Sequence, residues 1–145
     1  MKKRALAIGL FALLALAEIG DLAGLIVTLG DPAPAAAQLG ISPRAETIRA
    51  IILLAFALII ALNSAIALLG ALLRHALMVQ FGALMAGVGL VFYGLYQIGS
   101  ALFQHGQLLY AGVGVIYLGL AALAFRFARS GAPRPTPAQP KPEAG

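Results

Sequence analysis

The sequence predicts an all-α integral membrane protein, an antiparallel bundle of four transmembrane helices, and three observations lead to this prediction. Hydrophobic residues make up 61% of the 145-residue chain and charged residues only 10%, whereas soluble domains are roughly half apolar and a quarter charged. The mean hydropathy is +0.96. The apolar residues also form long blocks, as they do in segments that have lipid as their solvent.

Four apolar blocks define the predicted spans, which cover residues 5–29, 50–71, 76–103 and 108–125 within a transmembrane domain of residues 1–129. A membrane helix needs ~20 such residues, and only the fourth block is near the lower limit of length. The eight prolines all lie outside the blocks, in the first loop or near the C-terminus. Residues 130–145 are rich in Pro and Ala and are expected to form a disordered cytoplasmic tail.

Local signals mark where the helices begin and turn. Ser42 is suited to cap the second helix, with Pro43 at its first position and Glu46 in its first turn. The second and third spans are joined only by a short turn around Arg74 and His75, and the third and fourth by residues 104–107. Connections this short make consecutive helices antiparallel neighbours.

The basic residues predict the orientation of the bundle. Of the 10 Lys and Arg residues, Arg44 and Arg49 fall on one side of the membrane. The others fall on the opposite side, at Lys2, Lys3, Arg4, Arg74, Arg126, Arg129, Arg134 and Lys141. Because cytoplasmic loops carry the excess of Lys and Arg, both termini are expected in the cytoplasm, with the protein in the plasma or inner membrane.

The first block also has the features of a secretory signal peptide. A basic start and an apolar stretch are followed by Ala15-Leu16-Ala17, a small-x-small sequence of the kind that is cleaved. Apolar sequence resumes at residues 22–29, however, which a signal peptide does not need. We therefore expect residues 1–17 to stay attached. Cleavage would leave three spans with the same orientation.

Glu18 and Asp21 are the most informative residues of the chain. They are three residues apart, so they share one helix face and lie about 4.5 Å apart along the axis. No Lys or Arg lies at their depth in any span, and a carboxylate near the middle of a bilayer costs roughly 2.5–3.5 kcal/mol. At least one of the two is therefore expected to carry a proton, bind a cation or face water, which makes the pair a candidate proton- or cation-binding site. The alternative is that they mark only a signal-peptide boundary or a wet helix end.

Further polar residues lie at a depth where they could complete such a site. Asn63 and Ser64 are near the middle of the second span, and Tyr93 and Gln97 share one face of the third. Each also has a simpler interpretation as an interhelical hydrogen-bonding group, which is the usual role of such side chains in membrane helices.

Glycines in the last two spans predict how these helices pack. Residues 86–95 and 111–120 are identical at six of ten positions, which fits either a duplication or chance, and each copy carries two glycines seven residues apart. Small residues let membrane helices approach closely. In an antiparallel hairpin, Gly87 is expected to face Gly119. Gly94 is then expected to face Gly112 in the same register.

The first span carries a second glycine signal. Gly20 and Gly24 form a small-xxx-small pair next to Asp21. Such a pair favours close packing against a neighbouring helix, either within the chain or in a homo-oligomer.

Two short motifs resemble the small multidrug resistance transporters: Ala17-Glu18-Ile19 and Gly87-Val88-Gly89. Members of that family are four-helix proteins with a membrane-embedded glutamate in the first helix, so the resemblance implies a transport role for Glu18. It covers only a few residues. This chain is longer, has an extended first loop, and lacks the family's tryptophan and the surrounding aromatic pattern.

Composition narrows the function classes. The chain has no cysteine, and its two histidines, His75 and His105, fall at predicted helix ends on opposite membrane sides. We therefore expect no disulfide, no metal centre and no cofactor such as haem, and no nucleophile–base set of an enzyme is visible. The net charge of +5 is explained by orientation in the membrane, without nucleic acid as a partner.

Two functional hypotheses remain. The first is a proton- or cation-coupled small transporter or oligomeric channel that uses the acidic pair. The second is a non-catalytic membrane component that assembles with other membrane proteins through its Gly-rich helix faces. The lipid bilayer is the expected partner in both, and neither hypothesis specifies a substrate.

Overall fold

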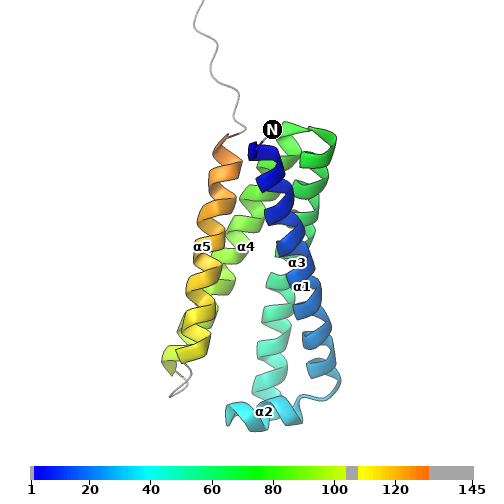
Figure 1. Ribbon diagram of the computed structural model, residues 1–145. Helices are drawn as coiled ribbons and strands as arrows, with labels where there is room; N and C mark the ends of the chain where they lie inside the picture. Colours follow the sequence, from blue (N-terminus) through cyan, green and yellow to red (C-terminus); the bar gives the residue numbers. More distant parts are fainter. Residues whose placement is uncertain (1, 104–107, 131–145) are drawn as a thin grey trace, which may run out of the picture.

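All secondary structure in the described residues is helical. The computed structural model describes residues 2–103 and 108–130 (Figure 1). Four of the helices are long and apolar enough to cross a membrane. This confirms the prediction of an all-helical protein with four long apolar helices. They are α1 (Lys2–Gly30), α3 (Pro43–Leu73), α4 (Ala76–Phe103) and α5 (Leu108–Ser130). The predicted connection at residues 104–107, which includes His105, and the predicted tail from residue 131 onward lie outside the described residues.

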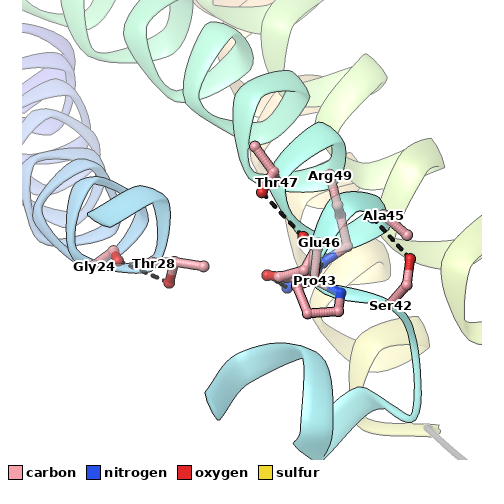
Figure 2. A network of polar contacts seen from close by, with 8 residues as sticks. All are labelled: Gly24, Thr28, Ser42, Pro43, Ala45, Glu46, Thr47 and Arg49. Carbon is pink, nitrogen blue, oxygen red and sulfur yellow. Dashed lines mark hydrogen bonds and ion pairs between the residues drawn. The ribbon is translucent and has the colours of Figure 1, made fainter. Parts of the chain in front are cut away.

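The beginning of α3 matches the predicted signals, although the helix is longer than its apolar block. Ser42 is the N-cap, and its Oγ accepts a hydrogen bond from the Ala45 amide at 3.2 Å. The Thr47 hydroxyl donates to the Pro43 carbonyl at 3.0 Å (Figure 2). Polar helix-forming residues therefore extend α3 ahead of the block that begins at residue 50. In the same way, α5 continues past residue 125 to Ser130.

A short helix that was not predicted, α2 (Ala33–Leu39), lies between α1 and α3. The Asp31 carboxylate accepts from the Ala33 amide at 3.2 Å at its start. Gly40 ends it in the left-handed conformation, with φ 66°, and the Ile41 amide returns to the Ala36 carbonyl at 3.1 Å. These are ordinary start and stop signals. The prolines of this segment had indicated a loop, yet Pro is well tolerated in the first turn of a helix.

The long helices pack in the order α1, α3, α4, α5, each against the next. The N-terminus, the turn between α3 and α4, and the C-terminal end of α5 lie at one end of the molecule, which we call the basic end (Figure 1). At that end, the Arg4 guanidinium donates to the carbonyls of Ala71 at 2.9 Å and Leu72 at 3.0 Å. From there the α1–α3 and α4–α5 pairs diverge toward the end that carries α2 (Figure 1).

Glycines allow α4 to lie close to both of its neighbours. A Cβ added to Gly82 would come within 2.6 Å of the Asn63 carbonyl oxygen of α3. On the other face, a Cβ added to Gly94 would come within 2.8 Å of the Gly114 carbonyl oxygen of α5. Backbone stands where a side chain would otherwise begin, so the close approach on both faces requires glycine.

The register of the α4–α5 contact differs from the predicted one. Gly94 lies opposite Gly114 rather than Gly112, and Gly87 faces the Phe125 ring, which would be 2.8 Å from an added Cβ. Gly112 and Gly119 are exposed. The prediction that they face α4 is therefore wrong, because the bulky Phe125 ring occupies the space opposite Gly87 and shifts the pairing.

The glycine pair of α1 also lies outside the packed interior. Gly20 and Gly24 are exposed, and a Cβ added to either has no described atom within 4 Å. Large apolar side chains likewise point outward along the long helices, including Leu16 at 68% exposure and Leu102 at 77%. Apolar exposure of this extent is typical of a surface covered by lipid or by a partner.

Candidate functional site

One face of α1 carries its buried residues. Phe11, Leu14 and Glu18 are buried at spacings of three and four, and Asp21 continues the same stripe at partial burial. This is the helical spacing of a face turned toward its neighbours. Glu18 has 0% exposure, so its carboxyl group lies in the interior among apolar residues. The predicted sharing of one face by the two acids is thus seen in the structure.

Asp21 joins three helices. Its Oδ2 atom accepts from the hydroxyl of Tyr117 on α5 at 3.1 Å and from that of Tyr93 on α4 at 3.4 Å. The two tyrosine rings stack with their centroids 4.5 Å apart. Two O–H donors directed at one carboxylate oxygen stabilise its negative charge. The contact thus links α1 to both α4 and α5.

The Glu18 carboxyl group has a different environment. It lies beside Asp21 and Tyr117, yet neither of its oxygens has a hydrogen-bond partner among the described residues. The ion pair between Arg49 and Glu46 is the only one among the described residues, so no cation compensates Glu18. A buried carboxylate without a partner carries a large desolvation cost. Protonation, a bound cation or a water molecule relieves that cost.

Of the predicted supporting residues on α4, Tyr93 contacts the acids directly. Gln97 lies one turn further along the same face, is 5% exposed, and its Oε1 atom has no hydrogen-bond partner among the described residues. A second unpaired acceptor therefore lies a helical turn from a residue that bonds Asp21. Unpaired buried acceptors of this kind are where water or a cation is usually found.

The two predicted supporting residues on α3, Asn63 and Ser64, do not contact the acids. Asn63 donates to the Ile59 carbonyl of its own helix at 2.8 Å, and Ser64 is buried with its hydroxyl unpaired among the described residues. The contact between Arg4 and Ala71 fixes the register of α1 against α3. In that register, Asn63 and Ser64 lie about two helical turns, roughly 10 Å, from the level of the acids.

Tyr117 is a site residue that the sequence analysis did not include. A tyrosine inside an apolar span needs a partner for its hydroxyl group, and that signal was present. The sequence did not indicate which residue is the partner, because Tyr117 and Asp21 are 96 residues apart. Their contact depends on how α1 and α5 are placed by the other helices.

Another buried acid lies in the first turn of α3, near the end of the molecule that carries α2. Glu46 is 1% exposed, and its two carboxylate oxygens accept from Arg49, at 2.8 Å from Nε and 3.2 Å from Nη2 (Figure 2). This fork-shaped pair satisfies the acid locally. We therefore assign Glu46 a structural role and leave it outside the candidate site.

Comparison of the chain with protein-family models, with curated proteins and with solved structures finds no match. The resemblance to small multidrug resistance transporters therefore rests on its few residues alone. Within residues 2–103 and 108–130, no three His, Cys, Asp or Glu side chains come together as they would to hold a metal ion. The candidate site therefore consists of the two acids and their immediate contacts.

Proposed function

We propose that this protein is a small membrane transporter or oligomeric channel that handles a proton or a monovalent cation, with Glu18 as the coupling acid and Asp21 as its partner. One observation carries the proposal. Glu18 is fully buried, and both of its carboxylate oxygens lack a hydrogen-bond partner among the described residues. Ionisable side chains inside membrane helices generally mark ion or proton pathways.

The two acids have different roles in this proposal. Asp21 is held in place by the hydroxyl groups of Tyr93 and Tyr117, which donate to it. Glu18 has no such donors and exchanges a proton or cation, since only its neutralised form suits the apolar surroundings. Loss of that proton or cation places two like charges on one face of α1. Their repulsion favours a rearrangement of α1 against α4 and α5, which is the coupling step.

The topology that goes with this function is an antiparallel bundle of four transmembrane helices in the plasma or inner membrane, with both termini cytoplasmic. Support comes from the basic end, where Lys3, Arg4, Arg74 and Arg126 line two adjoining pockets, because cytoplasmic ends of membrane helices carry the excess of Lys and Arg. A reporter that works only in the cytosol should therefore be active when it is fused to the C-terminus. Activity of a reporter that requires the periplasmic or extracellular side would overturn this orientation.

Chemical labelling tests the Glu18 carboxyl directly. A hydrophobic carbodiimide reacts with protonated carboxyl groups in apolar surroundings, so Glu18 should be labelled in wild-type protein reconstituted in lipid, and less as pH rises. Peptide mass spectrometry locates the label. Protection by Na⁺ or K⁺ at constant pH indicates cation exchange, whereas insensitivity to both ions indicates a proton. An unlabelled Glu18 at every pH would contradict the proposal.

Flux measurements test the transport itself. Proteoliposomes that contain an internal pH-sensitive dye are given an inward proton gradient and a potassium diffusion potential. Acidification should be faster than in protein-free liposomes, and Glu18→Gln should abolish the difference. Asp31→Asn is the matched control, because it removes the charge of an exposed acid outside the candidate site. Equal rates for wild type and Glu18→Gln would count against proton transfer by this acid.

The exposed glycines favour a second candidate function, assembly with other membrane proteins. Gly20 and Gly24 on α1, and Gly112 and Gly119 on α5, leave room for a close helix partner. If this is the function, Gly24→Leu should remove a partner recovered by crosslinking in native membranes, and Glu18→Gln should not. The opposite result supports the acidic pair as the functional site.

A further inference from the structure

An apolar groove of about 790 Å³ separates α1 from α5 at the basic end. Leu6, Gly9 and Leu10 line it on α1, and Leu123 and Phe127 line it on α5. Its volume is within the range of small-ligand pockets, roughly 300–1,000 Å³. Leu6 is 65% exposed, so the groove opens on the outer surface of the molecule, where the proposed topology places lipid.

Positive charge lies at the same groove. Lys3, Arg126 and Ser130 also line it. An adjoining pocket of about 280 Å³ shares Lys3 and Ser130 with the groove and is lined further by Arg74. Within residues 2–103 and 108–130, no ion pair engages Lys3, Arg74 or Arg126.

No acid of the described residues offsets these cations. Asp31 lies at the start of α2 and Glu46 in the first turn of α3. Glu18 and Asp21 lie further along α1 than the groove-lining residues. The groove is thus apolar along its walls and cationic at one end. That distribution complements an amphiphile with an anionic head and a hydrocarbon chain.

We propose that this groove binds an anionic phospholipid, with its phosphate between Lys3 and Arg126 and one acyl chain along Leu6, Gly9 and Leu10. A soluble anion would leave the apolar walls unused. A second copy of the chain, related by a two-fold axis along the membrane normal, would bring two basic ends to the same level and set like charges together. The inference rests on placement in a membrane and is independent of proton or cation handling by Glu18.

Native mass spectrometry of the full chain in detergent tests the head-group contacts. Phosphatidylglycerol should remain bound at concentrations where phosphatidylcholine with the same acyl chains does not. Inorganic phosphate at equal concentration should not displace it, because the acyl chain supplies part of the affinity. Lys3→Gln and Arg126→Gln should each weaken phosphatidylglycerol binding about fivefold. Arg129→Gln is the matched control, since Arg129 is an exposed cation of the same helix that does not line the groove.

A substitution that fills the groove tests the acyl-chain contact. Gly9 lines the groove and has no described atom within 4 Å of an added Cβ, so Gly9→Leu should fold normally and lose phosphatidylglycerol binding. Gly20→Leu, at an equally open position of α1 outside the groove, should retain it. Equal binding of the two lipids, or unchanged binding by Gly9→Leu, would overturn the proposal. Conversion of a dimer to a monomer by Gly9→Leu, with lipid binding intact, would show that the groove holds a second copy.

Discussion

Two glutamates of this chain are almost completely removed from solvent, and their surroundings are opposite. Glu46, at 1% exposure, accepts two hydrogen bonds from the guanidinium of Arg49. Glu18, at 0% exposure, has an acid at the equivalent spacing: Asp21 lies three residues further along α1, as Arg49 lies three residues beyond Glu46. The same spacing therefore neutralises one carboxylate and adds repulsion to the other.

The difference separates a structural acid from a candidate functional one. A fork-shaped pair of charges satisfies Glu46 within a single helical turn, near the start of α3, where the helix dipole also favours negative charge. Nothing comparable reaches Glu18 among the described residues. Burial alone would not distinguish the two residues, whereas the partners of their oxygens do.

The largest expected effect comes from removing the cation of the satisfied pair. Arg49→Met leaves the Glu46 carboxylate buried without a partner and should lower the free energy of unfolding by about 3 kcal/mol. Arg44→Met, which removes an exposed cation from the same turn, should change it little. Unfolding in mixed micelles with increasing denaturing detergent measures both. A small loss in Arg49→Met, equal to that of the control, would mean that Glu46 does not depend on its pair.

Disturbing the α4–α5 contact should destabilise the protein and change the contacts of Asp21, the neighbour of Glu18. A Cβ at position 94 would lie 2.8 Å from the Gly114 carbonyl oxygen, so Gly94→Ala should push the helices apart and destabilise the protein by roughly 1–3 kcal/mol. The displacement should also separate Tyr93 from Asp21. Gly112→Ala, at an exposed position, should be neutral or slightly stabilising. Equal stability of the two variants would mean that the helices can slide to a new register without loss.

Features that depend on interactions between residues close in sequence could be predicted from the sequence. Apolar block length and the Ser42 cap are local signals, and they located the long helices and the beginning of α3. The shared face of Glu18 and Asp21 also follows from local helix geometry. Each of these conclusions needs only a few consecutive residues.

Contacts between helices were harder to predict. The glycine register failed because the Phe125 ring lies opposite Gly87, and spacing alone carries no information about side-chain volume on the facing helix. The contact of Tyr117 with the acidic pair was not predicted, because its partner Asp21 is on α1. The pairing of a tyrosine with one acid rather than another is decided by the placement of whole helices.

The tyrosine contacts should have a moderate effect on stability. Tyr117→Phe removes the shorter of the two hydrogen bonds to Asp21, at 3.1 Å, and should cost about 1.5 kcal/mol, the upper end of the usual net contribution of a hydrogen bond. Tyr93→Phe, whose bond is 3.4 Å long, should cost less. In the Asp21→Asn background the cost of Tyr117→Phe should shrink, and a double-mutant cycle in micelles measures that coupling. A coupling of zero would show that the hydroxyl groups do not hold Asp21.

The smallest expected effect belongs to Glu18 itself. Glu18→Gln keeps the shape of the side chain and removes a carboxyl group that has no partner to lose among the described residues, so the free energy of unfolding should change by less than about 1 kcal/mol. Glu46→Gln weakens the bonds from Arg49 and should be clearly more destabilising in the same assay. A Glu18→Gln variant that unfolds as readily as Glu46→Gln would show that Glu18 is also held by a structural partner, and the contrast between the two acids would disappear. A stable Glu18→Gln variant without proton or cation flux would instead mean that this acid is kept for transport, since folding does not require it.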